Sequence, residues 1–322
     1  MPTELPPPRP PQPPPEPAGD PIFRGVQGAI LMVSLLALLA LFLLPFLSPK
    51  TGRGEPWRVA VTPPQFLTDG GGDDYRRAML EEAFLETADR MLAARNGLFA
   101  ERLERLDGGG DGPTTAAEVD EELRQRAFTA GFDELLTLAV QCDGEECRAL
   151  LRRLRSVDGS AEWRRPFRFD AASPLEAAEE LADELHVAFL KFSRRTDGAR
   201  LLADAEVYDA YLRAILDHRR GLLPTGKAIR SIGELRAEAP RFLDLHLLEA
   251  ELRAGDGDAE GAVDLLAVAH RIAPGDIRPL LRQVPLLLEL RRREEAREVL
   301  RTLEELLPGE PRLLTWREHI AK

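Results

Sequence analysis

The feature that most constrains this chain is an uninterrupted apolar run near its amino terminus. Residues 26–47 read VQGAILMVSLLALLALFLLPFL, and no Asp, Glu, Lys or Arg lies between Arg24 and Lys50. A helix rises about 1.5 Å per residue and the hydrocarbon core of a bilayer is roughly 30 Å thick, so about 20 such residues are enough to cross it. A buried core helix normally keeps a polar stripe, whereas only Gln27 and Ser34 are polar here. We therefore expect one transmembrane helix over residues 26–47.

The segments that flank this run carry no pattern of a folded core. Residues 1–25 are rich in proline, which predicts a disordered, polyproline-like tail, and residues 48–56 predict a short linker. The run is longer than a signal-peptide core and no A-x-A site follows it, which favours an uncleaved anchor. Its orientation stays open, because basic residues flank both ends in nearly equal number: Arg9 and Arg24 before it, and Lys50, Arg53 and Arg58 after it.

The composition of the chain limits its partners. The net charge is -12, the pI is near 5.1 and aromatic residues make up 6% of the chain. Nucleic-acid binding requires clustered excess Lys and Arg, and single-strand binding requires aromatic stacking platforms, so we expect no nucleic-acid partner. After the anchor, about 270 residues remain, which is enough for two domains.

Residues 57–195 alternate between strand-like and helix-like patterns. Residues 148–159 (RALLRRLRSVDG) fit a strand in a meander, but their leucines also fit a helical period. We expect strands over 57–63, 98–106, 132–141, 148–159 and 161–169, and helices over 75–95, 115–129 and 174–192.

This order of elements, with GFDELLTLAVQ, RALLRRLRSVDG and EWRRPF in the meander, resembles the amino-terminal α/β domain of TolB. Similar domains follow the membrane helix in CadC-type regulators and in some transmembrane kinases. The resemblance implies an α+β, sandwich-like domain over residues 57–195, held outside the cytoplasm. It rests on the pattern of elements, and the charged ERLERL departs from the apolar strand that the family has after its first helix.

Residues 204–322 contain a repeat with a 34-residue step. This spacing separates Pro240, Pro274 and Pro308, and it also separates Ala228, Ala262 and Ala296. The pattern resembles tetratricopeptide repeats (TPR), with a small residue in the second helix of each pair and a proline after it. The small residue of the first helix is Ala250 in the second unit, but Leu216 and Val284 occupy that position in the others. We expect units over 209–242, 243–276 and 277–310, a kink at Pro285, and a capping helix over 311–322.

The cysteines Cys142 and Cys147 flank an acidic turn, CDGEEC. If the flanking segments form a hairpin, the two cysteines lie opposite each other within disulfide range, and a bond would indicate an oxidising compartment. If residues 148–156 are helical, two reduced thiols are expected instead. A zinc site would need further ligands that the sequence does not place nearby.

No pattern in the sequence predicts catalysis. The five histidines are far apart and form no ligand pair, and neither glycine run ends in G-K-[ST]. The DGDAEG segment (256–261) starts like a calcium loop, but Ala267 stands where that loop needs its last carboxylate. We therefore expect no catalytic site, no metal and no cofactor.

The sequence predicts an α+β sandwich-like domain and an all-α TPR solenoid behind one transmembrane helix. The expected function is a non-enzymatic, membrane-anchored scaffold of the bacterial envelope, with a protein or peptide ligand in the TPR groove. The expected location is the bacterial inner membrane, single-pass through residues 26–47, with the carboxy-terminal domains in the periplasm. The alternative is the sensor portion of a transmembrane signalling protein that lacks its cytoplasmic effector.

Overall fold

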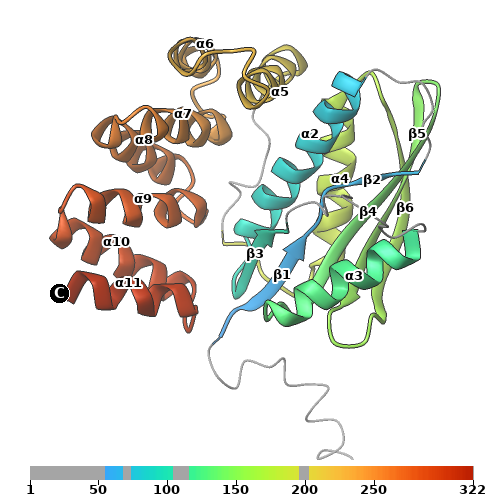
Figure 1. The fold of residues 1–322 in the computed structure, drawn as a ribbon, viewed down its shortest axis with the longest axis horizontal. Coiled ribbons are helices and arrows are strands. Elements are labelled where there is room, and N and C mark those ends of the chain that lie inside the picture. Colours follow the sequence, from blue (N-terminus) through green and yellow to red (C-terminus); the bar gives the residue numbers. More distant parts are fainter. Residues whose placement is uncertain (1–54, 68–73, 104–115, 196–202, 322) are drawn as a thin grey trace, which may run out of the picture. The chain divides into compact units, whose positions relative to one another are not determined.

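The computed structural model describes residues 55–67, 74–103, 116–195 and 203–321, which belong to the compact unit Gly54–Lys322. Its first part is a six-stranded mixed sheet with helices on both faces (Figure 1). The strands are β1 Trp57–Val61, β2 Gln65–Phe66, β3 Leu98–Arg102, β4 Glu134–Asp143, β5 Glu146–Arg155 and β6 Ala161–Asp170. The helices of this part are α2 Asp74–Ala93, α3 Ala116–Thr129 and α4 Pro174–Ala188.

The sheet has the strand order β3-β1-β4-β5-β6, with β2 also paired to β4. Strand β1 is parallel to β3 and β4, because α2 and then α3 carry the chain back to the edge where the next strand begins. Strands β4, β5 and β6 form an antiparallel meander. Residues 148–159, whose pattern fitted either a strand or a helix, begin within strand β5. In this strand Cys147, Ala149 and Leu151 are buried on one face.

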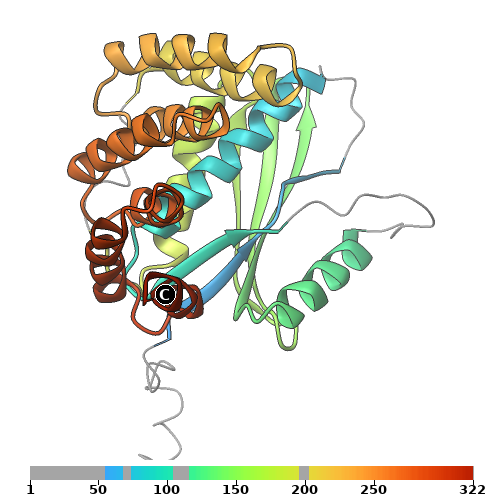
Figure 2. The same cartoon turned by 60° about the vertical axis from the view of Figure 1, so that its left-hand side comes forward.

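Each face of the sheet has its own core. Helices α2 and α4 cover one face, where Val59, Val61 and Leu136 pack among them. Helix α3 covers part of the other face, where Leu123 and Ala127 pack against alternate strand residues such as Ala60. Figure 2 shows α3 on the opposite side of the sheet from α2.

The expected sandwich-like arrangement of this domain is therefore wrong, since helices lie on both faces of the sheet. The physical reason is that an amphipathic pattern such as that of α3 shows that one helix face is buried but does not show which face of a sheet buries it.

The expected transmembrane helix over residues 26–47 lies outside the described residues, as do the tail 1–25 and most of the linker 48–56. Within the described part, no helix is long and apolar enough to cross a membrane. The longest of these helices, α2, has Arg76, Arg77 and Glu81 among its first turns, as expected for a helix with one face packed on a domain core. The described part of the chain thus does not support the predicted fold class with one transmembrane helix. The single-pass inner-membrane location, which was inferred from that helix, is not supported either.

Residues 204–321 form helical pairs. The pairs are α5 Ala205–Arg219 with α6 Thr225–Glu238, α7 Leu243–Gly255 with α8 Ala259–Ile272, and α9 Arg278–Glu289 with α10 Arg293–Leu306, followed by α11 Pro311–Ala321. The DGDAEG segment forms the turn before α8 and the first residues of that helix, and the Asp258 carboxylate caps it by accepting a hydrogen bond from the Gly261 amide at 2.9 Å. Helix α9 is not interrupted at Pro285.

Candidate protein-binding site

The small residues that repeat in the sequence are buried inside the helical repeats. Ala228, Ala262 and Ala296 lie in the second helices α6, α8 and α10, and each is fully buried. Ala250 lies in α7 and is buried in the same cluster as Ala262. A small side chain at such a buried position lets two packed helices approach closely.

The repeated prolines have a different position. Pro240, Pro274 and Pro308 each follow the end of a second helix and are exposed. A proline cannot continue a helix, so these residues separate one helical pair from the next.

Helix α2 of the first domain packs against the first helices of the repeats. Met79 and Ala83 of α2 belong to the same buried cluster as Tyr208 and Tyr211 of α5. At the other end of α2, Ala93 is buried together with Leu280 of α9. The surface that the first helices present toward α2 is thus occupied by the chain itself.

Buried ion pairs join α2 to the repeats. Arg90 Nη1 of α2 is 2.9 Å from Asp244 Oδ2 of α7, and Asp244 Oδ1 is 2.8 Å from Arg278 Nη1 of α9. Arg278 Nη2 is also 2.7 Å from Asp276 Oδ2. Burial alone would lower the pKa of Arg278, but Asp276 and Asp244 raise it well above its ordinary value. Arg278 is therefore a fixed positive charge between two repeats.

A second charged cluster lies along α2. Arg102 of β3 bonds Glu86 at 2.7 Å and Asp89 at 2.6 Å. The Tyr211 hydroxyl of α5 donates a hydrogen bond to Glu86 Oε2 at 3.0 Å. Burial alone would raise the pKa of Glu86, but Arg102 and Arg278 lower it to about 2. Arg219 at the end of α5 pairs with Glu82 of α2, so this cluster also joins the two parts of the chain.

An open groove remains beside this interface, where α5 ends and α6 begins. It has a volume of about 470 Å³, within the range of ligand-binding clefts. Ile215, Leu248 and Leu252 make its walls apolar, and the charged or polar residues that line it are His218, Arg219, Thr225 and Glu251. Leu222, in the turn between α5 and α6, is 69% exposed. We call this the α5–α7 groove.

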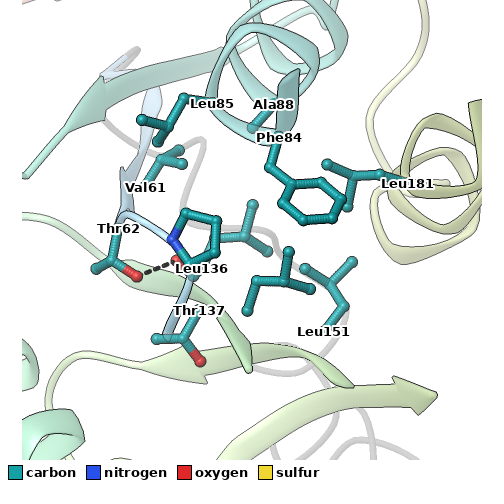
Figure 3. A pocket seen from close by; sticks show the side chains of 11 residues that line it. Val61, Thr62, Phe84, Leu85, Ala88, Leu136, Thr137, Leu151 and Leu181 are labelled. Atoms are coloured by element: carbon teal, nitrogen blue, oxygen red, sulfur yellow. Dashed lines mark hydrogen bonds between the residues drawn. The ribbon is translucent and has the colours of Figure 1, made fainter. Parts of the chain in front are cut away.

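Two other cavities are less suited to a ligand. A depression of about 350 Å³ between α10 and α11 is lined mainly by charged residues, with Leu300 and Ile320 as its apolar ones. Inside the first domain, a cavity of about 20 Å³ lies between the sheet and helices α2 and α4 (Figure 3). Apolar side chains surround it, the Thr62 hydroxyl donates to the Leu136 carbonyl at 3.2 Å, and the space could hold about one water molecule.

The candidate disulfide lies away from the groove. Cys142 and Cys147 are opposite each other in the β4–β5 hairpin and are joined by a disulfide, with their Cα atoms 4.0 Å apart. Cys147 is fully buried against the core under α2 and α4. The bond closes the end of the hairpin and is not part of the groove.

The histidines are not brought together. His186 Nδ1 is 3.0 Å from Arg95 Nη2, and His218 Nδ1 is 3.2 Å from the Leu223 carbonyl oxygen. His246 Nε2 donates to the Pro240 carbonyl at 2.9 Å, and His319 Nδ1 donates to the Thr315 carbonyl at 2.8 Å. His270 lies on another helix, α8. Among the described residues, no group of three or more His, Cys, Asp or Glu side chains is placed to hold a metal ion.

No pattern in the sequence predicted the residues that hold α2 to the repeats. Asp244 and Arg278 are one 34-residue step apart, so the same repeat position carries opposite charges in neighbouring units. That step was visible in the sequence, but Arg90, the other partner of Asp244, lies 154 residues before it in the chain and no periodicity connects the two. The sequence also did not predict the α5–α7 groove or the residues that line it.

The fold and the groove define this chain as an α/β domain joined to three helical pairs. No protein-family model matches it, and no curated protein sequence matches it. The type III secretion chaperone SycD of Yersinia enterocolitica, solved with a peptide of the translocator YopD, is similar with 16% identity and a TM-score of 0.34, over 38% of this chain and 97% of that one. A PelC dodecamer from Paraburkholderia phytofirmans is similar with 12% identity and a TM-score of 0.24, over 40% and 85%. Lipoprotein GNA1162 of Neisseria meningitidis is similar with 19% identity and a TM-score of 0.24, over 36% and 81%.

Proposed function

We propose that this chain is a non-enzymatic protein-interaction protein that binds a protein or peptide ligand in the α5–α7 groove. The observation that carries the proposal is the open groove with apolar walls beside an inner helix surface that is already filled by α2. We further propose that the helical pairs are tetratricopeptide repeats and that the α/β domain is of the TolB amino-terminal type.

The groove has the composition of a peptide site. Its apolar walls can bury the side chains of a ligand, and desolvated apolar contacts supply most of the free energy of such binding. Arg219, which pairs with Glu82, and Glu251, which is 3.2 Å from Arg282, line the groove with opposite charges, and a bound peptide can orient itself against them. Leu222 is exposed in the turn between Arg219 and Thr225, which both line the groove.

The inner surface of the repeats serves a different purpose in this proposal. Because α2 fills it with apolar contacts and the Arg90–Asp244–Arg278 ion pairs, a ligand there would first have to displace α2. Removing one partner of a buried ion pair is strongly unfavourable, so the open groove is the better site.

The test is a selection of random displayed peptides on the immobilised full chain, followed by affinity measurements by fluorescence anisotropy. Leu248→Asp places a carboxylate in the wall of the groove and should weaken the selected peptides by about tenfold or more, which is about 1.4 kcal/mol. Ala237→Asp adds the same charge on an exposed position of α6 and is the matched control. Equal affinity for the parent and Leu248→Asp, or no selected peptide, would contradict the proposal.

A further inference from the structure

A second candidate surface lies on the sheet, on the face opposite α2 and α4. In β5, Cys147, Ala149 and Leu151 point into the core under these helices. Successive strand residues point to opposite faces, so Arg148 and Arg152 point away from that core, as do Arg164 and Arg168 of β6. We call Arg148, Arg152, Arg164 and Arg168 the arginine face.

The arginines of this face oppose one another directly. Arg148 is paired with Arg168 and Arg152 with Arg164 across the β5–β6 ladder. Directly opposed side chains in a ladder have Cβ atoms about 4.5–5.5 Å apart, and like charges in that arrangement destabilise the sheet. Leu150 and Pro166 form the pair between them, so an apolar strip separates two positive pairs.

The arginine face is largely uncovered. Helix α3 covers the same side of the sheet only near β1, the start of β4 and Leu154. Arg148, Arg164 and Arg168 are exposed, and Arg168 pairs with Glu146 at 3.1 Å with 69% of its side chain accessible. Within the described residues, no ion pair or hydrogen bond joins the side chain of Arg148 or Arg164 to another group.

The arginine face places like charges opposite each other, which is unfavourable for the sheet. It also concentrates positive charge in a chain whose net charge is -12, and Arg148 and Arg164 contribute one arginine to each opposed pair. Carboxylates suit such pairs, because one carboxylate can accept two parallel hydrogen bonds from a guanidinium. An acidic partner would convert the repulsion within each pair into attraction.

We propose that the arginine face binds a short, extended, acidic segment of a partner protein. The two arginine pairs are four residues apart along the strands, which is about 13 Å. In an extended peptide the same distance separates residues i and i+4, and residue i+2 between them points to the same side. The complementary sequence is therefore acidic at the first and fifth positions and apolar at the third, over Leu150 and Pro166.

A protein segment fits this face better than a nucleic acid does. The face ends at the β4–β5 turn, where Asp143, Glu145 and Glu146 are exposed and Asp170 is paired with Glu146. A nucleic acid is a continuous array of phosphates and would extend past the face to these carboxylates, whereas a five-residue segment ends before them.

The test uses the full chain and a fluorescein-labelled peptide with the core Glu-Ser-Leu-Ser-Glu, measured by fluorescence anisotropy at low salt. The double variant Arg148→Glu, Arg164→Glu should weaken binding by about tenfold or more. It should still fold, because each new glutamate lies opposite an arginine, so its melting temperature should not be below that of the parent. The milder double variant Arg148→Gln, Arg164→Gln should weaken binding less than the double reversal does.

Arg230→Glu on the exposed side of α6 is the matched charge control and should change the affinity by less than about twofold. Leu248→Asp, in the α5–α7 groove, should also leave it unchanged, which separates this proposal from the proposed function. An unchanged affinity of the double reversal, an equal loss in Arg230→Glu, or no binding to the parent would overturn the proposal. Tighter binding of single-stranded DNA than of the peptide would assign the face to nucleic acid. Self-association of the parent that is lost in the double reversal would assign it to a second copy.

Discussion

At the scale of single residues, Asp244 connects the two parts of the described chain. Its two carboxylate oxygens pair with Arg90 of α2 and Arg278 of α9, and all three side chains are at least nine-tenths buried. A buried charge is tolerated only with such partners, because its desolvation is otherwise uncompensated. The contribution of this residue to stability thus depends on the contact between α2 and the repeats.

Asp244→Ala should lower the free energy of unfolding by about 3–5 kcal/mol, because two buried guanidinium groups lose their shared carboxylate. Urea unfolding of the full chain measures this loss. The control is Asp209→Ala in α5, whose partner Arg213 is exposed and 3.9 Å away, and which should cost less than about 1 kcal/mol. A loss in Asp244→Ala as small as that of the control would show that the buried ion pairs do not form.

His246 gives the fold a dependence on pH. Its Nε2 donates to the Pro240 carbonyl, and burial lowers its pKa below the ordinary 6.5. The unfolded chain therefore binds a proton at a higher pH than the folded chain does. The stability that the neutral imidazole contributes is fully present above pH 6.5 and is lost as the pH falls from 6.5 through the folded pKa.

His246→Gln should reduce this loss of stability with acid. Between pH 6.5 and the folded pKa, one histidine accounts for a slope of up to about 1.4 kcal/mol per pH unit. Burial also lowers the pKa of His270, so His270→Gln should reduce the remaining slope. Urea unfolding at several pH values measures how the free energy of unfolding changes with pH. The same change in the parent and in His246→Gln would contradict the assignment.

At the scale of elements, the contact between α7 and α8 depends on the size of residue 262. Ala262→Arg should cost about 3 kcal/mol or more, because the side chain overpacks the contact and buries a charge. Ala237→Arg, on the exposed side of α6, adds the same side chain and should change stability little. Thermal melting curves compare the two variants. A midpoint of Ala262→Arg within a degree or two of the parent would show that residue 262 does not lie at the contact between the helices.

The β4–β5 hairpin is closed by the Cys142–Cys147 disulfide. Because the closed loop is short, the double variant Cys142→Ala, Cys147→Ala should lose only about 1–2 kcal/mol. A reducing agent should lower the stability of the parent by a similar amount and leave the double variant unchanged. Two free thiols in the protein from its natural source, counted by mass spectrometry after alkylation, would show that the bond does not form there.

The elements differ in how far the sequence predicted them. The alternation of β1 and the 34-residue step of the repeats are local patterns, so they indicated strands and helical pairs directly. The residues of β5 fitted both the period of a strand and the period of a helix, and the pairing of β5 with β4 and β6 shows that they form a strand. The position of α3 depends on packing between distant segments, which its own residues do not specify.

At the scale of the whole molecule, the contact of α2 with the repeats could not be predicted. The sequence placed a ligand in the groove of the repeats but did not show that α2 fills their inner surface, because Arg90 and Asp244 are linked only in the folded chain. The α5–α7 groove, beside that surface, stays open. The central claim is therefore that a partner protein binds this groove while α2 stays in place.

A photo-cross-linking amino acid at position 222, introduced into the full chain in its natural host, tests this claim most directly. Leu222 lies in the turn beside the groove and is exposed, so the account predicts a covalent adduct of defined mass with a partner protein. The same amino acid at position 237, on the exposed side of α6, should give no such adduct, and adding Leu248→Asp should abolish the adduct at position 222. No adduct at position 222, or equal adducts from both positions, would contradict the account.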